Sequence, residues 1–209
     1  NSGGTNTVAL SAATLTVTGT TAPSKTYDGL TTATITGGTL SGVLGTDTVN
    51  LAQAGTYSSP NAGTSIPMTM ADTVSGTNVS TNYTLTQPTV TGTIYKAPLG
   101  VSISGVYSGT TTIAPTSFTL AGLVHDETVT SITSATVNSK DVSSNGSNYV
   151  TGLTFGTATA DMSNYAINAA YSVGSSGSTN GSVRSGTTTA GVNSGGTNTV
   201  ALSAATLTV

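Results

Sequence analysis

The chain has 209 residues, of which 5% are charged, and its four Lys and Arg against seven Asp and Glu side chains give a net charge of −3. So few basic residues cannot form the positive surface that nucleic acid or an anionic membrane requires, which excludes both as partners. Cysteine is absent, so disulfides and thiolate metal sites are excluded, and no apolar run approaches the roughly 18 residues of a membrane span.

Alternating hydroxyl and apolar side chains predict β-strands along most of the chain. In chain order, the clearest such runs are residues 14–18, 32–36, 84–86 and 101–104. A period of two buries one face of a strand, and Thr and Val favour extended backbone because their Cβ is branched. Turn signals separate the runs, at residues 27–29, 36–38, 60–63 and 145–146. No apolar stripe at helical spacing occurs, so the predicted fold class is all-β.

The first seventeen residues return unchanged at the end of the chain. Residues 1–17 and 193–209 are identical, so the sequence holds one period of 192 residues and the start of the next. A perfect copy at this distance indicates a tandem array, which is how long repetitive proteins grow. We therefore expect a collective function, with neighbouring repeats of the same polypeptide as partners.

A second, more divergent repeat lies inside this period. The turn Tyr27-Asp28-Gly29 matches Tyr107-Ser108-Gly109, and the pair Asn82-Tyr83 matches Asn164-Tyr165. The offset is 80 residues for the turn and 82 for the pair, as small loop insertions between equivalent strands would produce. The sequence therefore predicts two homologous domains within each period.

The predicted architecture is two tandem Ig-like β-sandwich domains that form one period of a longer fibre. We place the domains at residues 13–97 and 98–209, with the joint at Ala97-Pro98 because proline interrupts strand pairing. A Gly/Ser-rich stretch at about residues 172–196 is predicted as a loop inserted into the second domain. The duplicated end of the chain, residues 198–209, is predicted to be a closing strand that leads into the next domain.

Several motifs of the first domain resemble those of a known family. They are Lys25-Thr26-Tyr27-Asp28-Gly29, Leu40-Ser41-Gly42, Asp47-Thr48-Val49, Asn82-Tyr83-Thr84-Leu85 and the segment from Thr91 to Leu99. With them the chain resembles the YDG and MBG-type repeat domains, found in tandem in very large bacterial surface proteins and in adhesins of the filamentous haemagglutinin type. The resemblance is weaker in the second domain, where Ser108 replaces the aspartate. It implies an extracellular place on a bacterial cell surface, a structural or adhesive role and no catalysis.

The Tyr27-Asp28-Gly29 motif is interpreted as a turn that also supplies a ring to the core of the first domain. Aspartate can cap the turn, glycine can take a positive φ, and tyrosine can bury its ring with its hydroxyl at the rim. The alternative makes Asp28 a calcium ligand. Calcium needs six to eight oxygen ligands, and Asp47 and Asp72 are far from Asp28 in sequence, so the turn is favoured.

No catalytic residue, metal site or cofactor is predicted. The single histidine, His125, lies in a loop with Asp126 and Glu127, and adjacent loop residues seldom converge on one ion, so a solvated turn is favoured. A covalent Lys–Asn or Lys–Asp staple stays open for the three lysines. The structural motif is assigned to Tyr27, Asp28, Gly29, Asn82 and Tyr83 in the first domain and to Tyr107, Gly109, Asn164 and Tyr165 in the second.

The function that the sequence favours is a structural repeat of a bacterial surface fibre or giant adhesin. Such a repeat would supply length and stiffness between the cell and a distal binding tip, and identical filaments or surface glycans are further possible partners. The alternative is a glycan- or ice-binding module that uses Thr ladders such as Thr14, Thr16 and Thr18. An enzyme is not expected.

Overall fold

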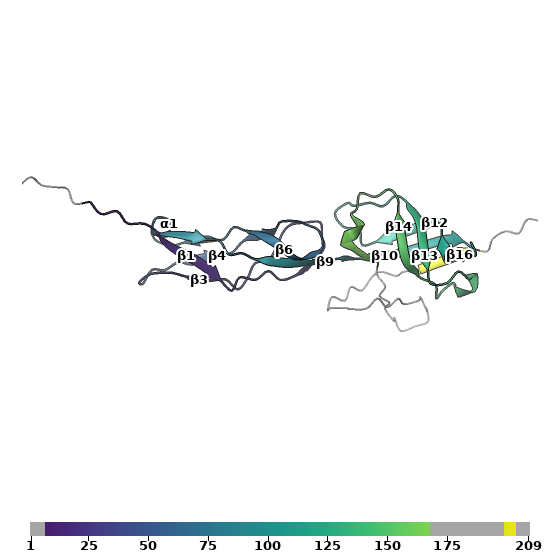
Figure 1. The fold of residues 1–209 in the computed structure, drawn as a ribbon, viewed down its shortest axis with the longest axis horizontal. Coiled ribbons are helices and arrows are strands. Elements are labelled where there is room, and N and C mark those ends of the chain that lie inside the picture. The colour runs from purple at the N-terminus through teal and green to yellow at the C-terminus, as the bar shows by residue number, and fades with distance from the viewer. Residues whose placement is uncertain (1–6, 168–198, 204–209) are drawn as a thin grey trace, which may run out of the picture. The chain divides into compact units, whose positions relative to one another are not determined.

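The computed structural model describes residues 7–167 and 199–203. Within these ranges the chain forms β-strands, one four-residue α-helix and two short 3-10 helices, so the all-β class is confirmed (Figure 1). The described residues divide into two compact units. Unit 1 holds residues 7–25 and 30–95, and unit 2 holds residues 26–29 together with 96–167 and 199–203.

Most elements of the first part of the chain are short strands. They are β1 (Ala13–Thr18), β2 (Lys25–Thr26), β3 (Thr39–Ser41), β4 (Asn50–Ala52), β5 (Gly55–Tyr57), β6 (Gly63–Met70), β7 (Thr73–Ser75), α1 (Val79–Asn82), β8 (Tyr83–Thr86) and β9 (Thr91–Tyr95). They form sheets of order β3-β1-β8, β2-β9-β6-β5 and β4-β7.

Unit 2 is built around one long strand. Its elements are β10 (Ala97–Val106), β11 (Thr112–Ile113), β12 (Pro115–Ala121), β13 (Ile132–Val137), η1 (Val142–Ser144), β14 (Val150–Phe155), η2 (Met162–Asn164), β15 (Tyr165–Ile167) and β16 (Thr199–Ser203). The central sheet has the order β12-β10-β15, with β16 also paired to β10, and a second sheet has the order β11-β13-β14.

The two units share a frame of three strands. In unit 1, β1 runs antiparallel to β3 and parallel to β8, and in unit 2, β10 runs antiparallel to β12 and parallel to β15. Ala13 lies opposite Tyr83, and Ala97 lies opposite Tyr165. The first strands β1 and β10 therefore occupy equivalent places in their units.

Glycines after β3 and β12 reinforce this equivalence. Gly42 has φ +98° and Gly122 has φ +99°, and a Cβ on either would lie 2.5 Å from a carbonyl oxygen, that of Thr14 or of Pro98. Thr14 and Pro98 are therefore equivalent too. Contrary to the sequence prediction, Pro98 does not interrupt the strand, since β10 pairs through it with Ala166.

Burial follows the predicted alternation on the first strands. Leu15 and Val17 are buried, whereas Thr14, Thr16 and Thr18 between them are exposed. Leu99, Val101 and Ile103 of β10 are buried in the same way. The predicted strand at residues 32–36 is wrong: its ends form only isolated bridges, Thr32 to Thr56 and Thr36 to Thr21.

The two copies of the duplicated segment differ in structure. Residues 199–203 form β16, which runs parallel to β10 and buries Leu202 to 4% exposure. The identical residues 7–11 form no strand, and Leu10 there is 92% exposed.

The predicted Gly/Ser-rich loop at 172–196 lies outside the described residues. No helix among the described residues is long and apolar enough to cross a membrane.

Candidate functional site

A glutamate in unit 2 accepts hydrogen bonds from two tyrosines. Tyr27, which is 5% exposed, donates its hydroxyl to Oε1 of Glu127 at 2.7 Å. Tyr165 donates its hydroxyl to Oε2 of the same carboxylate. The two rings meet edge to face, with centroids 5.5 Å apart and planes at 81°. We call Val124, Glu127 and Tyr165 the carboxylate–tyrosine site of unit 2, and Tyr27 is the residue that it holds.

The loop after β12 and the helix η2 position this site. The Glu127 amide donates to the Val124 carbonyl at 3.0 Å, and the Val124 amide donates to the Tyr165 hydroxyl at 3.0 Å. At η2, Asp161 accepts from the Ser163 amide at 3.0 Å and so caps the turn that leads to Tyr165. The hydroxyl of Tyr165 is therefore fixed from both sides, as donor to the carboxylate and as acceptor from the backbone.

Burial and the carboxylate together keep both phenols protonated. The pKa of Tyr27 is raised to about 12, first by burial and then by the hydrogen bond and negative charge of Glu127, against a smaller opposing contribution from Asn164. Burial and then Glu127 raise the pKa of Tyr165 in the same way. Ionising either phenol would put a second negative charge beside the glutamate, which is unfavourable at this distance.

This arrangement predicts an alkaline loss of stability in unit 2. The native pKa of Tyr27 lies above the ordinary value of 10.0, so folding favours the protonated phenol. Its stabilising contribution should be complete below pH 10 and should fall as the pH rises towards 12. Denaturant unfolding of unit 2 between pH 8 and 12 measures the effect, and Tyr27→Phe should show a shallower decline. Equal slopes for the two proteins would contradict the role of this hydroxyl.

Unit 1 carries the same hydrogen-bond pattern. Tyr83 donates its hydroxyl to Oδ2 of Asp47 at 2.7 Å and accepts from the Leu44 amide at 3.0 Å, and the Asp47 amide donates to the Leu44 carbonyl at 3.2 Å. The hydrogen bond to Asp47 raises the pKa of Tyr83. Leu44, Asp47 and Tyr83 therefore form the carboxylate–tyrosine site of unit 1.

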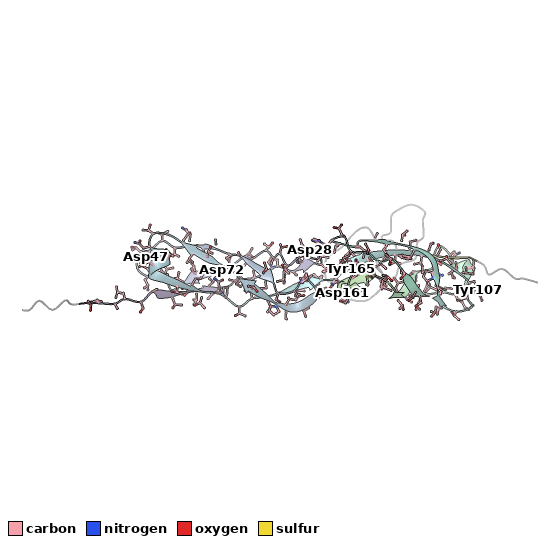
Figure 2. All side chains as sticks on the ribbon, turned by 90° about the horizontal axis from the view of Figure 1, so that it is seen from above. Asp28, Asp47, Asp72, Tyr107, Asp161 and Tyr165 are labelled. Atoms are coloured by element: carbon pink, nitrogen blue, oxygen red, sulfur yellow. The ribbon has the colours of Figure 1, made fainter. Side chains whose placement is uncertain are left out.

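The site of unit 1 is more exposed than that of unit 2. Leu44 is 59% exposed and Asp47 is exposed, whereas their counterparts Val124 and Glu127 are half-buried. No second tyrosine hydroxyl reaches Asp47 within the described parts of the chain. Figure 2 shows Asp47 at one end of unit 1 and Tyr165 with Asp161 at one end of unit 2.

The predicted motif residues fall into two groups. Asn82 and Asn164 end a helical turn and lead into Tyr83 and Tyr165, and the two tyrosines belong to the two sites. Tyr27 is buried, but the prediction that it belongs to the core of the first domain is wrong, because it packs in unit 2.

The rest of the motif behaves as a turn. Gly29 has φ +76°, and a Cβ there would lie 3.0 Å from the His125 side chain, so the position requires glycine. Asp28 lies between Tyr27 and Gly29 in this turn. His125 takes a φ of +54° in a solvent-facing loop, where unit 1 has Gly45 at +58°.

Sequence reasoning missed the two carboxylates. The sequence places Glu127 in a solvated turn and Asp47 in a motif shared with the YDG family, with calcium binding as a disfavoured alternative, and it predicts a tyrosine partner for neither. A usable signal was present, because Asp47-Thr48-Val49 and Glu127-Thr128-Val129 are equivalent in the internal repeat and each precedes the Asn-Tyr pair of its own domain. An acid kept at the same place in both copies indicates a shared contact.

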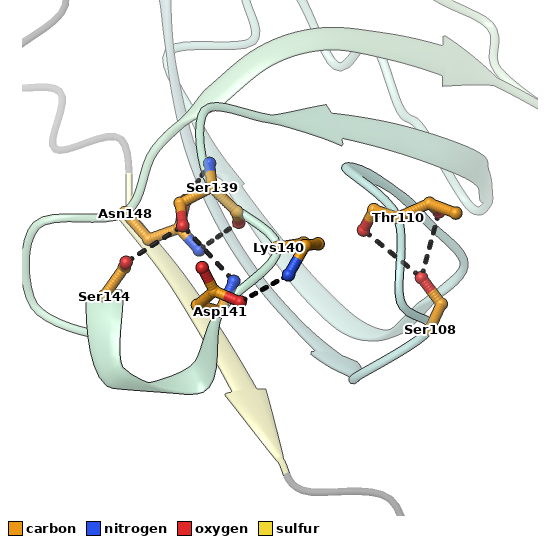
Figure 3. A network of polar contacts seen from close by, with 7 residues as sticks. All are labelled: Ser108, Thr110, Ser139, Lys140, Asp141, Ser144 and Asn148. Atoms are coloured by element: carbon orange, nitrogen blue, oxygen red, sulfur yellow. Dashed lines mark hydrogen bonds and ion pairs between the residues drawn. The ribbon is translucent and has the colours of Figure 1, made fainter.

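The second copy of the turn is exposed. Tyr107 is 38% exposed, and Nζ of Lys140 lies 5.9 Å from the centre of its ring while pairing with Asp141 at 2.7 Å. Figure 3 shows this ion pair and the separate contacts of the Ser108 hydroxyl with Thr110. Gly109 has the same φ as Gly29, +76°, but a Cβ on it would meet no atom within 4 Å.

A buried carboxylate lies elsewhere in unit 1. Asp72 is 4% exposed, and its Oδ1 accepts from the Ala54 amide at 3.0 Å, while the Gln87 side chain bonds both backbone groups of Asp72. Its Oδ2 has no partner among the described residues. In the described ranges no three His, Cys, Asp or Glu side chains lie close enough to hold a metal ion.

The fold and these contacts define an all-β protein in which a tyrosine from a Tyr-Xaa-Gly turn binds a carboxylate–tyrosine site. Residues 11–91 match the YDG domain family, so the chain contains a YDG-type domain over this segment. The matched segment includes Tyr27, Asp47 and Tyr83, and it ends before Tyr107. No curated protein and no solved structure matches the chain.

Proposed function

We propose that the chain is a structural repeat of an extracellular bacterial surface fibre or giant adhesin. In this proposal each period consists of two tandem Ig-like β-sandwich domains and adds length between the cell and a distal binding tip. The exact 192-residue period supports an array. The YDG match, together with the resemblance to tandem domains of bacterial surface proteins, supports the cell-surface location.

The observation that carries the proposal is the shortness of the connections between strands. Strand β9 ends at Tyr95 and β10 begins at Ala97, so one residue, Lys96, lies between them. The duplicated segment has an equally short connection: one residue, Ala12, lies between Ser11, the equivalent of the last residue of β16, and Ala13, where β1 begins. One residue offers only two soft dihedral angles. Such connections favour a stiff array over a flexible chain of beads.

Small-angle scattering on chains of one, two and three periods tests this proposal. A stiff array should lengthen by a constant increment for each added period. Flexible connections would instead make the mean end-to-end distance grow roughly as the square root of the number of periods. Square-root growth would contradict the proposed spacer role. Electron micrographs of the three-period chain provide an independent check on its length and on lateral packing.

A second candidate function is a glycan- or ice-binding surface, and the sheet β3-β1-β8 favours it. Thr14 lies beside Thr84 and Thr16 beside Thr86 in parallel register, and all four are exposed. Along β3, Ser41 and Thr39 continue the exposed face beside Thr16 and Thr18. The face therefore presents hydroxyls about 7 Å apart along strands and about 4.8 Å apart between them.

Glycan-array binding and thermal hysteresis measure this second candidate. Thr16→Glu, at the centre of the face, should abolish either activity. Thr34→Glu is the matched control, because Thr34 is exposed but lies outside this sheet. If neither assay gives a signal with the unmodified chain, this candidate is excluded and the spacer role is unaffected.

A further inference from the structure

We propose that the carboxylate–tyrosine site of unit 1 binds the Tyr107-Ser108-Gly109 turn of another copy of this period. In an array, the copy that supplies the turn is the preceding period. The inference rests on one part of the proposed function, namely that periods follow one another in the same chain. Its ligand is a tyrosine side chain on a glycine turn, presented by a chain of the same sequence.

The occupied site of unit 2 shows what such binding looks like. There Tyr27 donates to Glu127 at 2.7 Å, packs edge-on against Tyr165, and is buried to 5% exposure. Gly29, two residues later, lies against His125, where there is no room for a Cβ. The turn is thus bound by a carboxylate, an aromatic ring and the side chain of a loop residue.

The site of unit 1 has the carboxylate and the tyrosine of this receptor in equivalent places. In both units a tyrosine opposite the first residue of the first strand donates to a carboxylate and accepts from a loop amide at 3.0 Å. In unit 1 the carboxylate uses Oδ2 for Tyr83, which leaves Oδ1 of the exposed Asp47 to accept a second hydroxyl. Gly45 stands where unit 2 has His125, so the facing loop leaves more room for an incoming turn.

The apolar surface around each site matches this difference in occupancy. Val43 is 37% exposed and Leu44 is 59% exposed in unit 1. Their equivalents in unit 2, Leu123 and Val124, are half-buried. An incoming tyrosine ring would cover the exposed pair, and burying apolar surface of this kind is favourable.

The glycine of the turn at residues 107–109 has the same backbone φ as the glycine of the bound turn. Gly109 and Gly29 share a φ of +76°. The Ser108 hydroxyl donates to the Thr112 carbonyl at 3.2 Å and contacts Thr110, so the turn is held in shape without a partner. A preformed loop loses little entropy on binding. Tyr107 is therefore ready to enter a site of the kind that holds Tyr27.

The path of the chain brings this turn to the correct end of unit 2. Strand β16 runs parallel to β10, and its last residue, Ser203, lies opposite Val106, directly before Tyr107. By the duplication, the first strand of a following unit 1 would begin at the equivalent of Ala13, with one residue between it and Ser203. In β1, Ala13 lies opposite Tyr83. Figure 2 shows Tyr107 at the end of unit 2 away from Tyr165, as a head-to-tail contact requires.

Photo-oxidative coupling of tyrosines tests the proposal. Light, a ruthenium tris-bipyridyl complex and persulfate remove one electron and one proton from each phenol, and two adjacent rings then join by a carbon–carbon bond. Peptide mass spectrometry identifies the joined pair. Tyr27 and Tyr165, with centroids 5.5 Å apart, are the internal positive control. Tyr95, which is 48% exposed, reports random collisions of Tyr107.

In a chain of two periods we expect Tyr107 of the first to couple to Tyr83 of the second. The yield should exceed that of the Tyr107–Tyr95 product by about tenfold or more, because a short covalent connection gives an effective concentration in the millimolar range. In the 209-residue chain the same product should join two molecules, and its yield should rise with protein concentration.

Two matched variants separate specific docking from chance. Asp47→Ala should lower the Tyr107–Tyr83 yield about tenfold, since it removes a hydrogen bond to a charged acceptor, and should leave the Tyr27–Tyr165 yield unchanged. Glu127→Ala should lower the Tyr27–Tyr165 yield and leave the Tyr107–Tyr83 yield unchanged. The proposal would be overturned if the Tyr107–Tyr83 yield equals the Tyr107–Tyr95 yield and does not change in the Asp47→Ala variant. Linear growth in the scattering series would then still support the spacer role, so the two failures are distinguishable.

Discussion

Replacing Tyr27 with alanine should destabilise unit 2 by about 3 kcal/mol or more, in the range found for buried aromatic truncations, and leave unit 1 almost unchanged. The variant loses a ring packed edge-on against Tyr165 and a hydrogen bond to Glu127. It also leaves a half-buried carboxylate with one partner fewer. Native-state hydrogen exchange measures the effect, because it reads protection in β10 and β1 separately.

Tyr107→Ala is the matched control for this prediction. The residue occupies the equivalent turn, but it is 38% exposed in this chain, so a dilute sample should lose less than about 1 kcal/mol. Tyr27→Phe separates the ring from the hydroxyl and should cost about 1.5 to 3 kcal/mol, the contribution of a hydrogen bond to a charged group. Loss of protection in β1 rather than β10 would show that Tyr27 serves unit 1 after all.

A chain that ends at Val192 should lose at least about 3 kcal/mol of stability in unit 2, through a large apolar side chain and several hydrogen bonds. It lacks β16, which pairs five residues with β10 and buries Leu202. It also lacks the two hydrogen bonds between the Asn145 amide group and the Leu202 backbone, at 2.8 and 3.0 Å. The bared edge of β10 should promote association. Calorimetry and sedimentation velocity measure the two effects.

The duplication supplies an identical segment for the control. Removing residues 1–11 deletes the same Thr-Val-Ala-Leu-Ser sequence, yet Leu10 is 92% exposed there, so melting should not change. In the intact chain, Asn145→Ala should destabilise unit 2 by about 2 kcal/mol, since two hydrogen bonds are lost. Equal melting of both shortened chains would mean that β16 contributes nothing to the sheet.

The alternation of hydroxyl and apolar side chains predicted the fold class and the buried face of single strands. The alternation of Thr with Leu15 and Val17 determines which face of β1 is buried, and the all-β class followed from such runs. The run at residues 32–36 has the same alternation but forms only isolated bridges. Strand formation also requires a neighbouring strand, which the run itself does not encode. The prediction that Pro98 interrupts strand pairing was wrong as well. Pro98 is the second residue of β10 and lies opposite Ala166 of β15.

The candidate site was harder to predict because its contacts are distant in sequence. The tyrosines, the glycine of the turn and the Asn-Tyr pairs were all recognised from the internal repeat. Their partners were not, since Tyr27 and Glu127 are separated by 100 residues. The turn motif indicates that the Tyr27 ring is suited to burial, but it does not show in which compact unit the burial takes place.

In the proposed array, the position of the duplication also determines how the number of periods can change. The identical copies of the Thr-Val-Ala-Leu-Ser segment lie just before β1 and within β16, so the boundary of the period falls at the closing strand of a sheet. Unequal recombination between two such copies removes or adds whole periods. Because the exchange falls within identical segments, each recombined chain still has one closing strand equivalent to β16 for every strand equivalent to β10. We therefore expect the copy number to vary among related strains while each remaining domain stays fully paired.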